Sequence, residues 1–450
     1  EPHVHETPGI YYYTAVYEEE TDTTSADNNW LCFTAEKDES KIWYNNQDNT
    51  PDVQYSIDEG KTWNIMEPVK SVVLNKGDKI YFKGNNPNGF SHGESEYTNF
   101  YMAGKLAASG SVMSLIDGKG TSKEIPCDNC FYSLFSGCYP LTEAPELPAE
   151  KITKGCYKGM FNSCINLRKA SQLPAKVMKE SCYFCMFAGC SSLETAPALP
   201  STELADSCYS NMFSTCTKLR EAPELPATKL EKYCYDYMFA GCNFATPPAL
   251  PAKKLAEGCY FSMFTSCKIK EAPELPATEL EKYCYCNMFS YCTLLETPPA
   301  LPAKKMAENC YNSMFGGCSN LMTAPELPAM ELAPMCYTYM FNNCSKLEKA
   351  PELPAKELVE YCYADMFSRC RNLKYIKVGV MTLDNEFDAT INWVEGIEGA
   401  GVFIFQCGST YDKHGNSEVP THFEIISNKY SIGLSTSACD SFVYNGVTYH

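Results

Sequence analysis

The stretch SCYFCMFAGCSSLETAPALPSTEL, residues 181–204, contains the pattern that decides the fold. The same pattern, CYxxMFxxCxxLxxAPxLPAxxL, occurs ten times in the middle of the chain. Successive copies are 26 residues apart, or 25 residues apart in two cases, and the second cysteine always lies eight positions after the first. The first cysteines are Cys130, Cys156, Cys182, Cys208, Cys234, Cys259, Cys284, Cys310, Cys336 and Cys362. A period this short and regular predicts units that stack and share one core, which is a solenoid.

Each copy divides into two parts. The apolar residues at the first cysteine and four, five and eight positions later share one helical face, so CYxxMFxxC predicts a short helix. The LxxAPxLP part is too short and too rich in proline for a helix, and it predicts an extended segment. Prolines such as Pro223 and Pro273 lack an N–H, so we expect short, interrupted strands at this column. The two short copies lack one residue just after Cys242 and Cys267, where we expect a turn.

Units such as residues 181–204 and 308–332 resemble those of the BspA-like leucine-rich-repeat surface proteins of Bacteroides-type bacteria. The resemblance covers about residues 127–380 and implies an α/β solenoid of about ten repeats of 25–26 residues. It also implies an exported or surface-anchored protein used for adhesion and interaction, and no particular activity follows from it. Phe131 and Leu134 replace Tyr and Met in the first copy, as expected of a capping repeat, and Ser171 replaces a proline in the second.

The flanking segments lack the repeat. Residues 1–125 contain strand-like runs at 30–33, 41–44, 53–57, 72–75 and 79–83, which predict a β-rich, sandwich-like domain. SIDEGKTW (56–63) matches an Asp-box hairpin, a structural turn when it occurs once. After the repeats of 126–380, residues 381–427 resemble the family's capping segment, through the NWxxGxxxxGxF pattern that begins at Asn392. Residues 428–450 resemble the start of a short module of secreted proteins.

Twenty of the 26 cysteines occupy the two repeat columns. Three interpretations compete: disulfides, metal sites, or a structural ladder of buried thiols, exemplified by Cys156, Cys164, Cys208, Cys216, Cys234 and Cys242. Helical spacing would separate the two cysteines of one copy by about 12 Å, too far for a disulfide. Equivalent cysteines of adjacent copies each have two equal neighbours, so the thiol ladder is favoured. The repeats contain no histidine, and the CxxC pairs Cys127/Cys130 and Cys182/Cys185 do not form a paired zinc pattern, so we expect no metal or cofactor.

Two sets of surface positions are candidates for binding. The positions that follow CY vary most between copies and include the aromatic residues Phe184, Tyr237, Phe261 and Tyr339. Aromatic rings bind sugars or protein partners at low entropic cost, although packing against neighbouring copies explains them equally well. The position before LP alternates between Glu and Ala, and its glutamates include Glu224, Glu274 and Glu326. This row is either a solubilising face or a strip for a cation-dependent or basic partner.

Composition narrows the function. The 450-residue chain has a formal charge of −18, which disfavours nucleic acid as a partner, and no apolar stretch is long enough to span a membrane. The six histidines are scattered through the flanks, and no Ser/His/Asp or HExxH arrangement occurs. His414 and His422, near Asp412 and Glu418, are better explained as surface-loop residues than as metal ligands.

We therefore predict a non-catalytic interaction or adhesion protein, at the cell surface (outer membrane) or secreted. Its partner is a host or bacterial surface protein or a glycan. The alternative is a glycan-binding module of a surface carbohydrate-capture system, which clustered exposed aromatic residues would favour.

Overall fold

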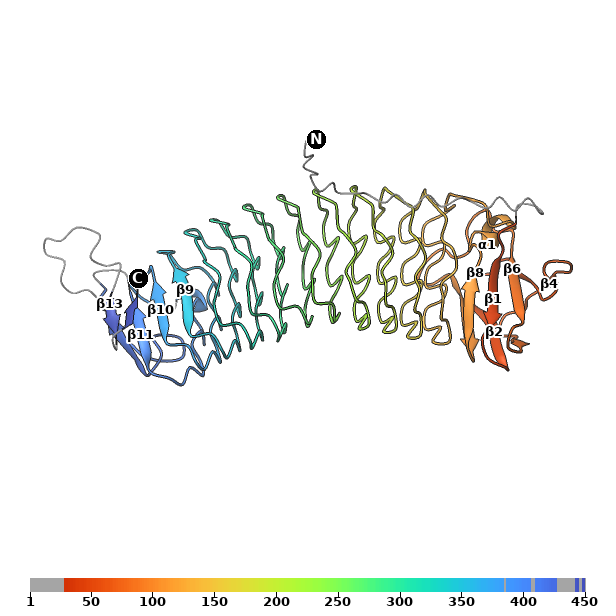
Figure 1. Cartoon of the computed structure of the whole chain (residues 1–450). Helices are drawn as coiled ribbons and strands as arrows, with labels where there is room; N and C mark the ends of the chain where they lie inside the picture. Colours follow the sequence, from red (N-terminus) through yellow and green to blue (C-terminus); the bar gives the residue numbers. More distant parts are fainter. Residues whose placement is uncertain (1–27, 384–385, 406–408, 427–441, 445–446, 450) are drawn as a thin grey trace, which may run out of the picture.

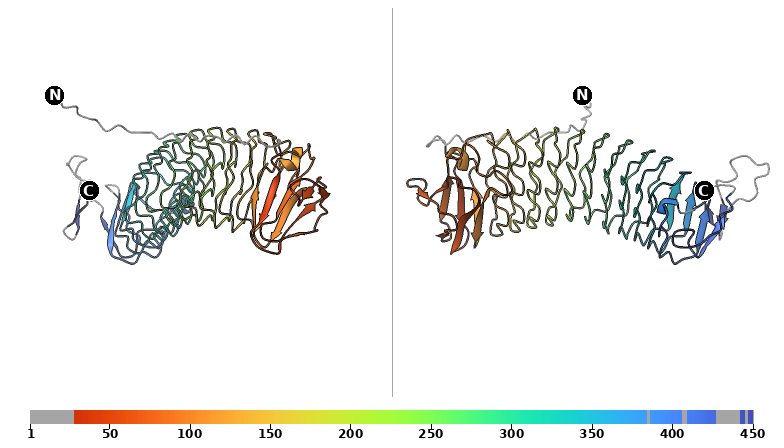
Figure 2. Two further views of the ribbon diagram at one scale, coloured as in Figure 1. Left: turned by 45° about the vertical axis from the view of Figure 1, so that its right-hand side comes forward. Right: turned by 180° about the vertical axis from the view of Figure 1, so that it is seen from behind.

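The computed structural model describes residues 28–383, 386–405, 409–426, 442–444 and 447–449. The chain forms one long stack of coils, with a β-sandwich at the N-terminal end and a parallel sheet near the C-terminal end (Figure 1). Seen from two further directions, the stack is gently bowed (Figure 2). The predicted repeat solenoid is therefore present. All of residues 1–27 and most of residues 428–450 lie outside the described residues, and His3, His5 and His450 are among them.

The N-terminal sandwich consists of two antiparallel sheets, with strand orders β4-β3-β6-β1-β8 and β5-β2-β7. The five strand-like runs of the sequence correspond to β1, β2, β3, β5 and β6, whereas β4, β7 and β8 were not predicted. Phe33 and Phe82 of the first sheet pack against Phe100 of the second, with ring centroids 6.2 and 5.1 Å apart. The elements are β1 (Leu31–Ala35), β2 (Ser40–Gln47), β3 (Gln54–Ser56), β4 (Asn64–Ile65), β5 (Val72–Leu74), β6 (Lys79–Lys83), β7 (Tyr97–Ala103), β8 (Leu106–Ser109) and α1 (Ser114–Asp117).

The Asp-box segment forms the β3–β4 hairpin. Asp58 accepts hydrogen bonds from the Thr62 N–H at 2.9 Å and from the Thr62 hydroxyl at 2.6 Å. The Gly60 N–H donates to the Ser56 hydroxyl at 2.9 Å. The two bonds from Thr62, with a third from the Ser56 hydroxyl at 2.7 Å, stabilise the carboxylate and lower the pKa of Asp58 to about 2. The motif is thus a turn held by its own side chains.

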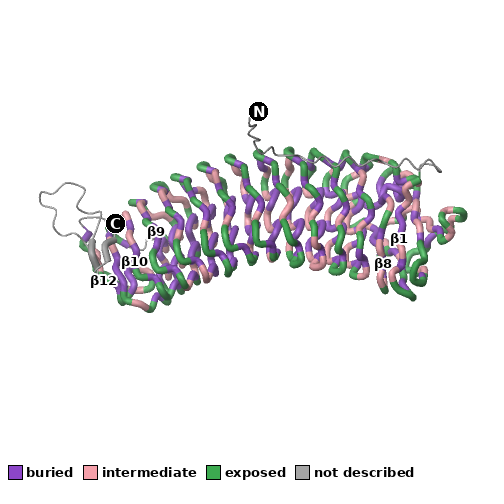
Figure 3. The backbone as a smooth tube through the Cα atoms, viewed as in Figure 1, coloured by how far each residue is buried: buried purple, intermediate pink, exposed green. Residues whose placement is uncertain are grey.

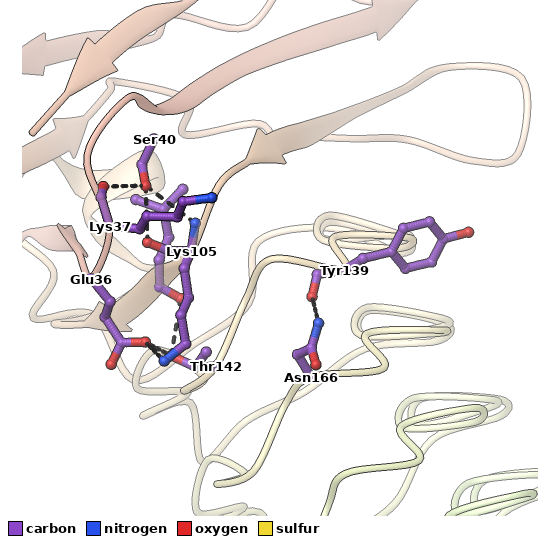
Figure 4. A network of polar contacts seen from close by, with 8 residues as sticks. Glu36, Lys37, Ser40, Lys105, Tyr139, Thr142 and Asn166 are labelled. Atoms are coloured by element: carbon purple, nitrogen blue, oxygen red, sulfur yellow. Dashed lines mark hydrogen bonds and ion pairs between the residues drawn. The ribbon is translucent and has the colours of Figure 1, made fainter. Parts of the chain in front are cut away.

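The sandwich joins the first repeat through the edges of both sheets. Phe100 of β7 donates its N–H to Leu134 O at 2.8 Å, and Leu106 of β8 donates to Pro140 O at 3.1 Å. Figure 4 shows the polar contacts at this junction, where Lys105 pairs with Glu36 at 2.9 Å and Thr142 donates to the same carboxylate at 3.2 Å. The sandwich therefore covers the first repeat as an additional coil would.

The predicted helix of the CYxxMFxxC segment is wrong. In the described residues, α1 and the 3₁₀ turn η1 (Glu386–Asp388) are the helical elements, and both lie outside the ten repeats. Each CYxxMFxxC segment is instead a run of tight turns in which every fourth residue has a positive φ angle. In the copy around Cys182 these residues are Ser181 (53°), Cys185 (54°) and Gly189 (76°). The true period is therefore four residues rather than 3.6.

This backbone alternates between two kinds of hydrogen bond. The N–H groups of Cys182, Phe184 and Met186 each bond to the carbonyl three residues earlier in the same coil. The N–H groups between them bond to the next coil at 2.8–3.1 Å: Tyr183 to Cys208 O, Cys185 to Ser210 O, Phe187 to Met212 O and Gly189 to Ser214 O. A helix directs all of its N–H groups along its own axis, and so it would leave the coils unconnected.

The buried side chains form continuous ladders along the stack. Tyrosines from Tyr157 to Tyr363 are stacked nearly parallel, with centroids of neighbouring rings 5.8–6.0 Å apart. The phenylalanines from Phe135 to Phe367 stack in the same way, at 5.4–5.9 Å. Both ladders are fully buried. Figure 3 shows buried and exposed stretches in the same place in successive coils, so exposed residues also form rows.

The stack ends in a four-stranded parallel sheet of β9 (Lys349–Leu353), β10 (Tyr375–Val378), β11 (Gly401–Ile404) and β12 (Phe423–Ile426). Trp393 lies 6.2 Å from both Tyr363 and Phe367, measured between ring centroids. One indole therefore covers the last ring of each ladder. β13 (Phe442–Tyr444) and β14 (Val447–Tyr449) form a separate hairpin.

Thr215 tests the turn geometry, because it is a β-branched residue held at a φ of 59°. Replacement of Thr215 by glycine is expected to raise the free energy of unfolding by about 1 kcal/mol, since glycine adopts this conformation without steric cost. Gly241 is the equivalent residue of the next copy, with a φ of 74°, and Gly241→Ala is expected to lower stability by a similar amount. Urea denaturation of both variants measures the effect. A destabilised Thr215→Gly chain would contradict the four-residue turn.

Candidate interaction surfaces

The four aromatic residues that follow CY are all at least partly accessible to solvent. Phe184, Tyr237 and Phe261 are partly buried, and Tyr339 is 43% exposed. The rings of Tyr237 and Phe261 are 5.4 Å apart, and Phe261 also contacts Tyr283 at 6.4 Å. Phe184 instead packs under the Lys158 ammonium, 5.1 Å from the ring centroid. The structure thus brings together two of the four aromatic residues that the sequence singled out, and adds Tyr283.

Asp236 lies beside this aromatic group, and the sequence analysis did not identify it. One of its carboxylate oxygens is buried without a hydrogen-bond partner, and the carboxylate accepts a bond from Ser210. Burial outweighs this bond and raises the pKa of Asp236 to about 6. Ser210 occupies the equivalent position of the preceding repeat, so the interaction follows from the stacking of copies. The sequence did contain a signal for this residue, because Asp236 is a charged residue between two tyrosines in the variable positions after CY.

The glutamates before LP form an exposed row on the extended segments, in which Glu224, Glu274 and Glu326 all face solvent. None of these three glutamates forms an ion pair with the described residues. By contrast, glutamates elsewhere on the coils pair with a lysine or arginine one copy away, as Glu194 does with Arg220 at 2.7 Å. The row therefore retains unneutralised negative charge.

The backbone of this row is also incompletely paired. Isolated bridges join neighbouring copies on either side of the APxLP segment, for example Lys169 with Thr195 and Val177 with Glu203. In the second to eighth copies, all of which the structure describes, the N–H of the residue before LP forms no backbone hydrogen bond. In the first copy, however, Glu146 donates to Gly110 O at 2.8 Å, and in the ninth Glu352 belongs to β9. The prolines on either side of this residue lack an N–H, which explains the interrupted strands.

Hollows open between neighbouring APxLP segments, and we call them slots. One slot has a volume of about 590 Å³ and is lined by residues 194–200 with Arg220, Glu221, Ala222, Pro223, Glu224 and Pro226. A second, of about 660 Å³, is lined by residues 322–328 with Lys349, Ala350, Pro351, Glu352 and Pro354. Each slot combines proline rings with acidic side chains. The sequence predicted the glutamate row but not the hollows beside it.

The cysteine columns lie inside the core. All 24 described cysteines are free thiols. The ten second-column thiols each lie 3.0–3.2 Å from a phenylalanine carbonyl. For nine of them the carbonyl belongs to the neighbouring coil, as Phe187 O does for Cys216, whereas Cys138 contacts Phe100 O of β7. Burial raises the pKa of the ladder thiols, to about 12 for Cys156 and Cys242. It also raises the pKa of Cys164, Cys208, Cys216 and Cys234 well above the usual range of a thiol. Such thiols are unreactive near neutral pH.

No cluster of three or more His, Cys, Asp or Glu side chains suited to a metal ion occurs among the described residues. His414 Nδ1 lies 3.0 Å from Pro420 O, so its ring has a structural contact in the loop.

The repeats also match a known protein family. The BspA type leucine-rich repeat region, a family description with six copies of the repeat, matches residues 128–262, 157–296 and 260–387. These matches together span more than half of the chain. The chain belongs to the BspA-type leucine-rich-repeat family. No curated protein and no solved structure matches it. In the part of this BspA-type chain that the structure describes, no helix is long and apolar enough to cross a membrane.

Removal of the Asp236 charge tests the electrostatics of the turn face. The folded-state pKa is raised, so folding is most favoured at low pH, where Asp236 is protonated, and this stability is lost as the pH rises through about 6. Asp236→Asn is therefore expected to stabilise the protein at pH 7.5 by about 1–3 kcal/mol, with the difference shrinking toward pH 4. Urea denaturation at both pH values measures it. The exposed Asp48→Asn variant is the control and is expected to show no such pH dependence. Equal stabilities of the Asp236→Asn and unmodified chains at pH 7.5 would contradict the buried charge.

Proposed function

We propose that this BspA-type chain is a non-catalytic interaction protein of the cell surface, or a secreted one, that binds a macromolecular partner through its solenoid. The observation that supports this most is the row of exposed glutamates before LP, with a proline-lined slot beside Glu224 and another beside Glu326. Glu224, Glu274 and Glu326 repeat an exposed carboxylate along the stack. Weak contacts repeated in this way add up through multivalency, and stacked coils lose little further entropy on binding.

The chemistry of the slots favours a partner that presents lysine or arginine side chains. Glu224, Glu274 and Glu326 form no ion pair with a lysine or arginine of the described residues, and the chain as a whole has a formal charge of −18. A basic partner is therefore attracted at long range and finds unneutralised carboxylates at the surface. The unpaired N–H groups beside the glutamates offer donors for its carbonyl groups. Tyr237 and Phe261 on the turn face supply a second, apolar contact.

A triple variant, Glu224→Gln, Glu274→Gln and Glu326→Gln, tests the acidic row with an oligolysine peptide as the probe. At about 0.5 kcal/mol for each exposed charge, binding at low salt is expected to weaken about tenfold, as measured by fluorescence anisotropy. The matched control replaces three ion-paired glutamates, Glu180, Glu257 and Glu308, and so changes the net charge by the same amount. Equal weakening in both triple variants would show that only net charge matters and would refute the slot assignment.

Glycan binding is the second candidate, and a feature of the N-terminal sandwich favours it. Trp43 of β2 and Tyr101 of β7 are stacked on the outer face of the β5-β2-β7 sheet, with centroids 5.8 Å and planes 13° apart. Asn45 is the next exposed residue on this face of β2, whereas Asn99, its cross-strand partner on β7, is buried. An aromatic surface beside an exposed amide suits a sugar ring, whose faces are apolar and whose edges carry hydroxyls. The solenoid aromatics do not form one such group, because Tyr339 lies four copies beyond Tyr237.

Trp43→Ala separates the two candidates. Under the glycan hypothesis it is expected to abolish retardation of the protein by soluble xylan or mucin in affinity electrophoresis, because the stacking surface is lost. Tyr237→Ala is the matched aromatic control from the solenoid and is expected to migrate like the unmodified chain in the same gels. Retention of glycan binding by the Trp43→Ala chain would exclude the sheet surface.

A further inference from the structure

Cys127 and Cys130 form a cluster with His92 where the sandwich meets the first repeat. The two thiols are within hydrogen-bonding distance of each other, with Cys130 donating to the Cys127 sulfur. Cys127 Sγ also lies 3.9 Å from His92 Nδ1 and 3.4 Å from Ser91 O. Gly89 allows this approach, because a Cβ atom there would lie 2.1 Å from the Cys127 sulfur. The chain therefore brings a CxxC pair into contact with an imidazole 35 residues away.

The two thiols differ in access and in acidity. Cys127 is partly exposed, whereas Cys130 is completely buried as the first rung of the cysteine ladder. The hydrogen bond from Cys130 and the nearby His92 lower the pKa of Cys127 to about 7, against the opposing effects of partial burial and of the Asp128 charge. Burial raises the pKa of Cys130 well above its usual range. Thiol–disulfide exchange requires this division of roles: an accessible thiolate attacks first, and a protected thiol then resolves the mixed disulfide.

The second CxxC pair of the chain lacks these features. Cys182 donates to the Met178 sulfur at 3.8 Å rather than to Cys185. Burial raises the pKa of Cys185 to about 11, and the nearby Asp236 charge adds to this effect. Sequence spacing is identical in the two pairs, so the difference is produced by the surroundings of each thiol.

We propose that Cys127 and Cys130 form a redox-active dithiol site that reacts with small disulfides. The Cys127 thiolate attacks one sulfur of the disulfide RSSR, which forms a mixed disulfide and releases RS⁻. The Cys130 sulfur then attacks Cys127, transfers its proton to solvent or to the released thiolate, and displaces the second RS⁻. Overall, two protein thiols are oxidised to one Cys127–Cys130 disulfide and RSSR is reduced to two RSH.

The native full-length chain is tested with Ellman's reagent, an aromatic disulfide, at pH 7.5. Cys407 and Cys439 lie outside the described residues and are replaced by serine in every chain compared, so that the fast phase reports on the described cysteines. The otherwise unmodified protein is expected to release two aromatic thiolates per chain in its fast phase and to lose the mass of two hydrogens. The Cys130→Ser chain is expected to release one thiolate and to retain one aromatic group on Cys127. The buried ladder thiols are expected to react only after denaturation, which also measures how many of them are free. Cys127→Ser is expected to abolish the fast phase.

The matched control is the double variant Cys182→Ser and Cys185→Ser, which is expected to leave the fast phase unchanged. His92→Asn is expected to slow the phase at least several-fold, because the imidazole no longer favours the thiolate. If the unmodified chain retains the aromatic group as a stable mixed disulfide, Cys127 is only a reactive single thiol and the proposal is wrong. A fast phase that persists in Cys127→Ser would also overturn it.

Discussion

The division of the turn segment's amides between two directions holds this solenoid together. Alternate N–H groups close turns within a coil, and those between them bond to the next coil. This pattern requires a backbone that reverses its local handedness every fourth residue, which explains the positive φ angles at Ser181, Cys185 and Gly189. The residues between these points carry the apolar side chains of CYxxMFxxC. The stack exists because the same residues that close each turn also present the core.

Ring stacking fills the space between the hydrogen-bonded coils. Neighbouring tyrosine rings are stacked with centroids 5.8–6.0 Å apart, while amides of the same segment bond to the next coil. On the extended side the prolines lack an N–H, so the chain does not form a continuous sheet there. The slots are the consequence. The residue before LP has a backbone partner again at the two ends of the stack. Glu146 bonds to the sandwich, and Glu352 belongs to β9 of the terminal sheet.

The surroundings of each cysteine, rather than its type, determine its chemistry. Cys216 is enclosed by the core and lies against the Phe187 carbonyl, so its thiol acts as a small apolar side chain. Cys127 lies at the junction with the sandwich, where a loop contributes His92. The contacts of the aromatic residues after CY also depend on the residues around them. Phe184 packs under a lysine, whereas Tyr237 and Phe261 contact each other, because the neighbouring copies differ.

The amino-acid sequence by itself determined the number of copies, their register, the buried columns and five strands of the sandwich. The repeated residues and the alternation of apolar and polar residues can be read from the sequence alone. It did not determine the local backbone. Apolar residues spaced by one and four over nine positions fit a helix as well as a four-residue turn, and only bonding to adjacent coils decides between them. Contacts between distant residues were also beyond it. Cys127 meets His92, and Ser210 meets Asp236, only because stacking places residues 25 or more positions apart side by side.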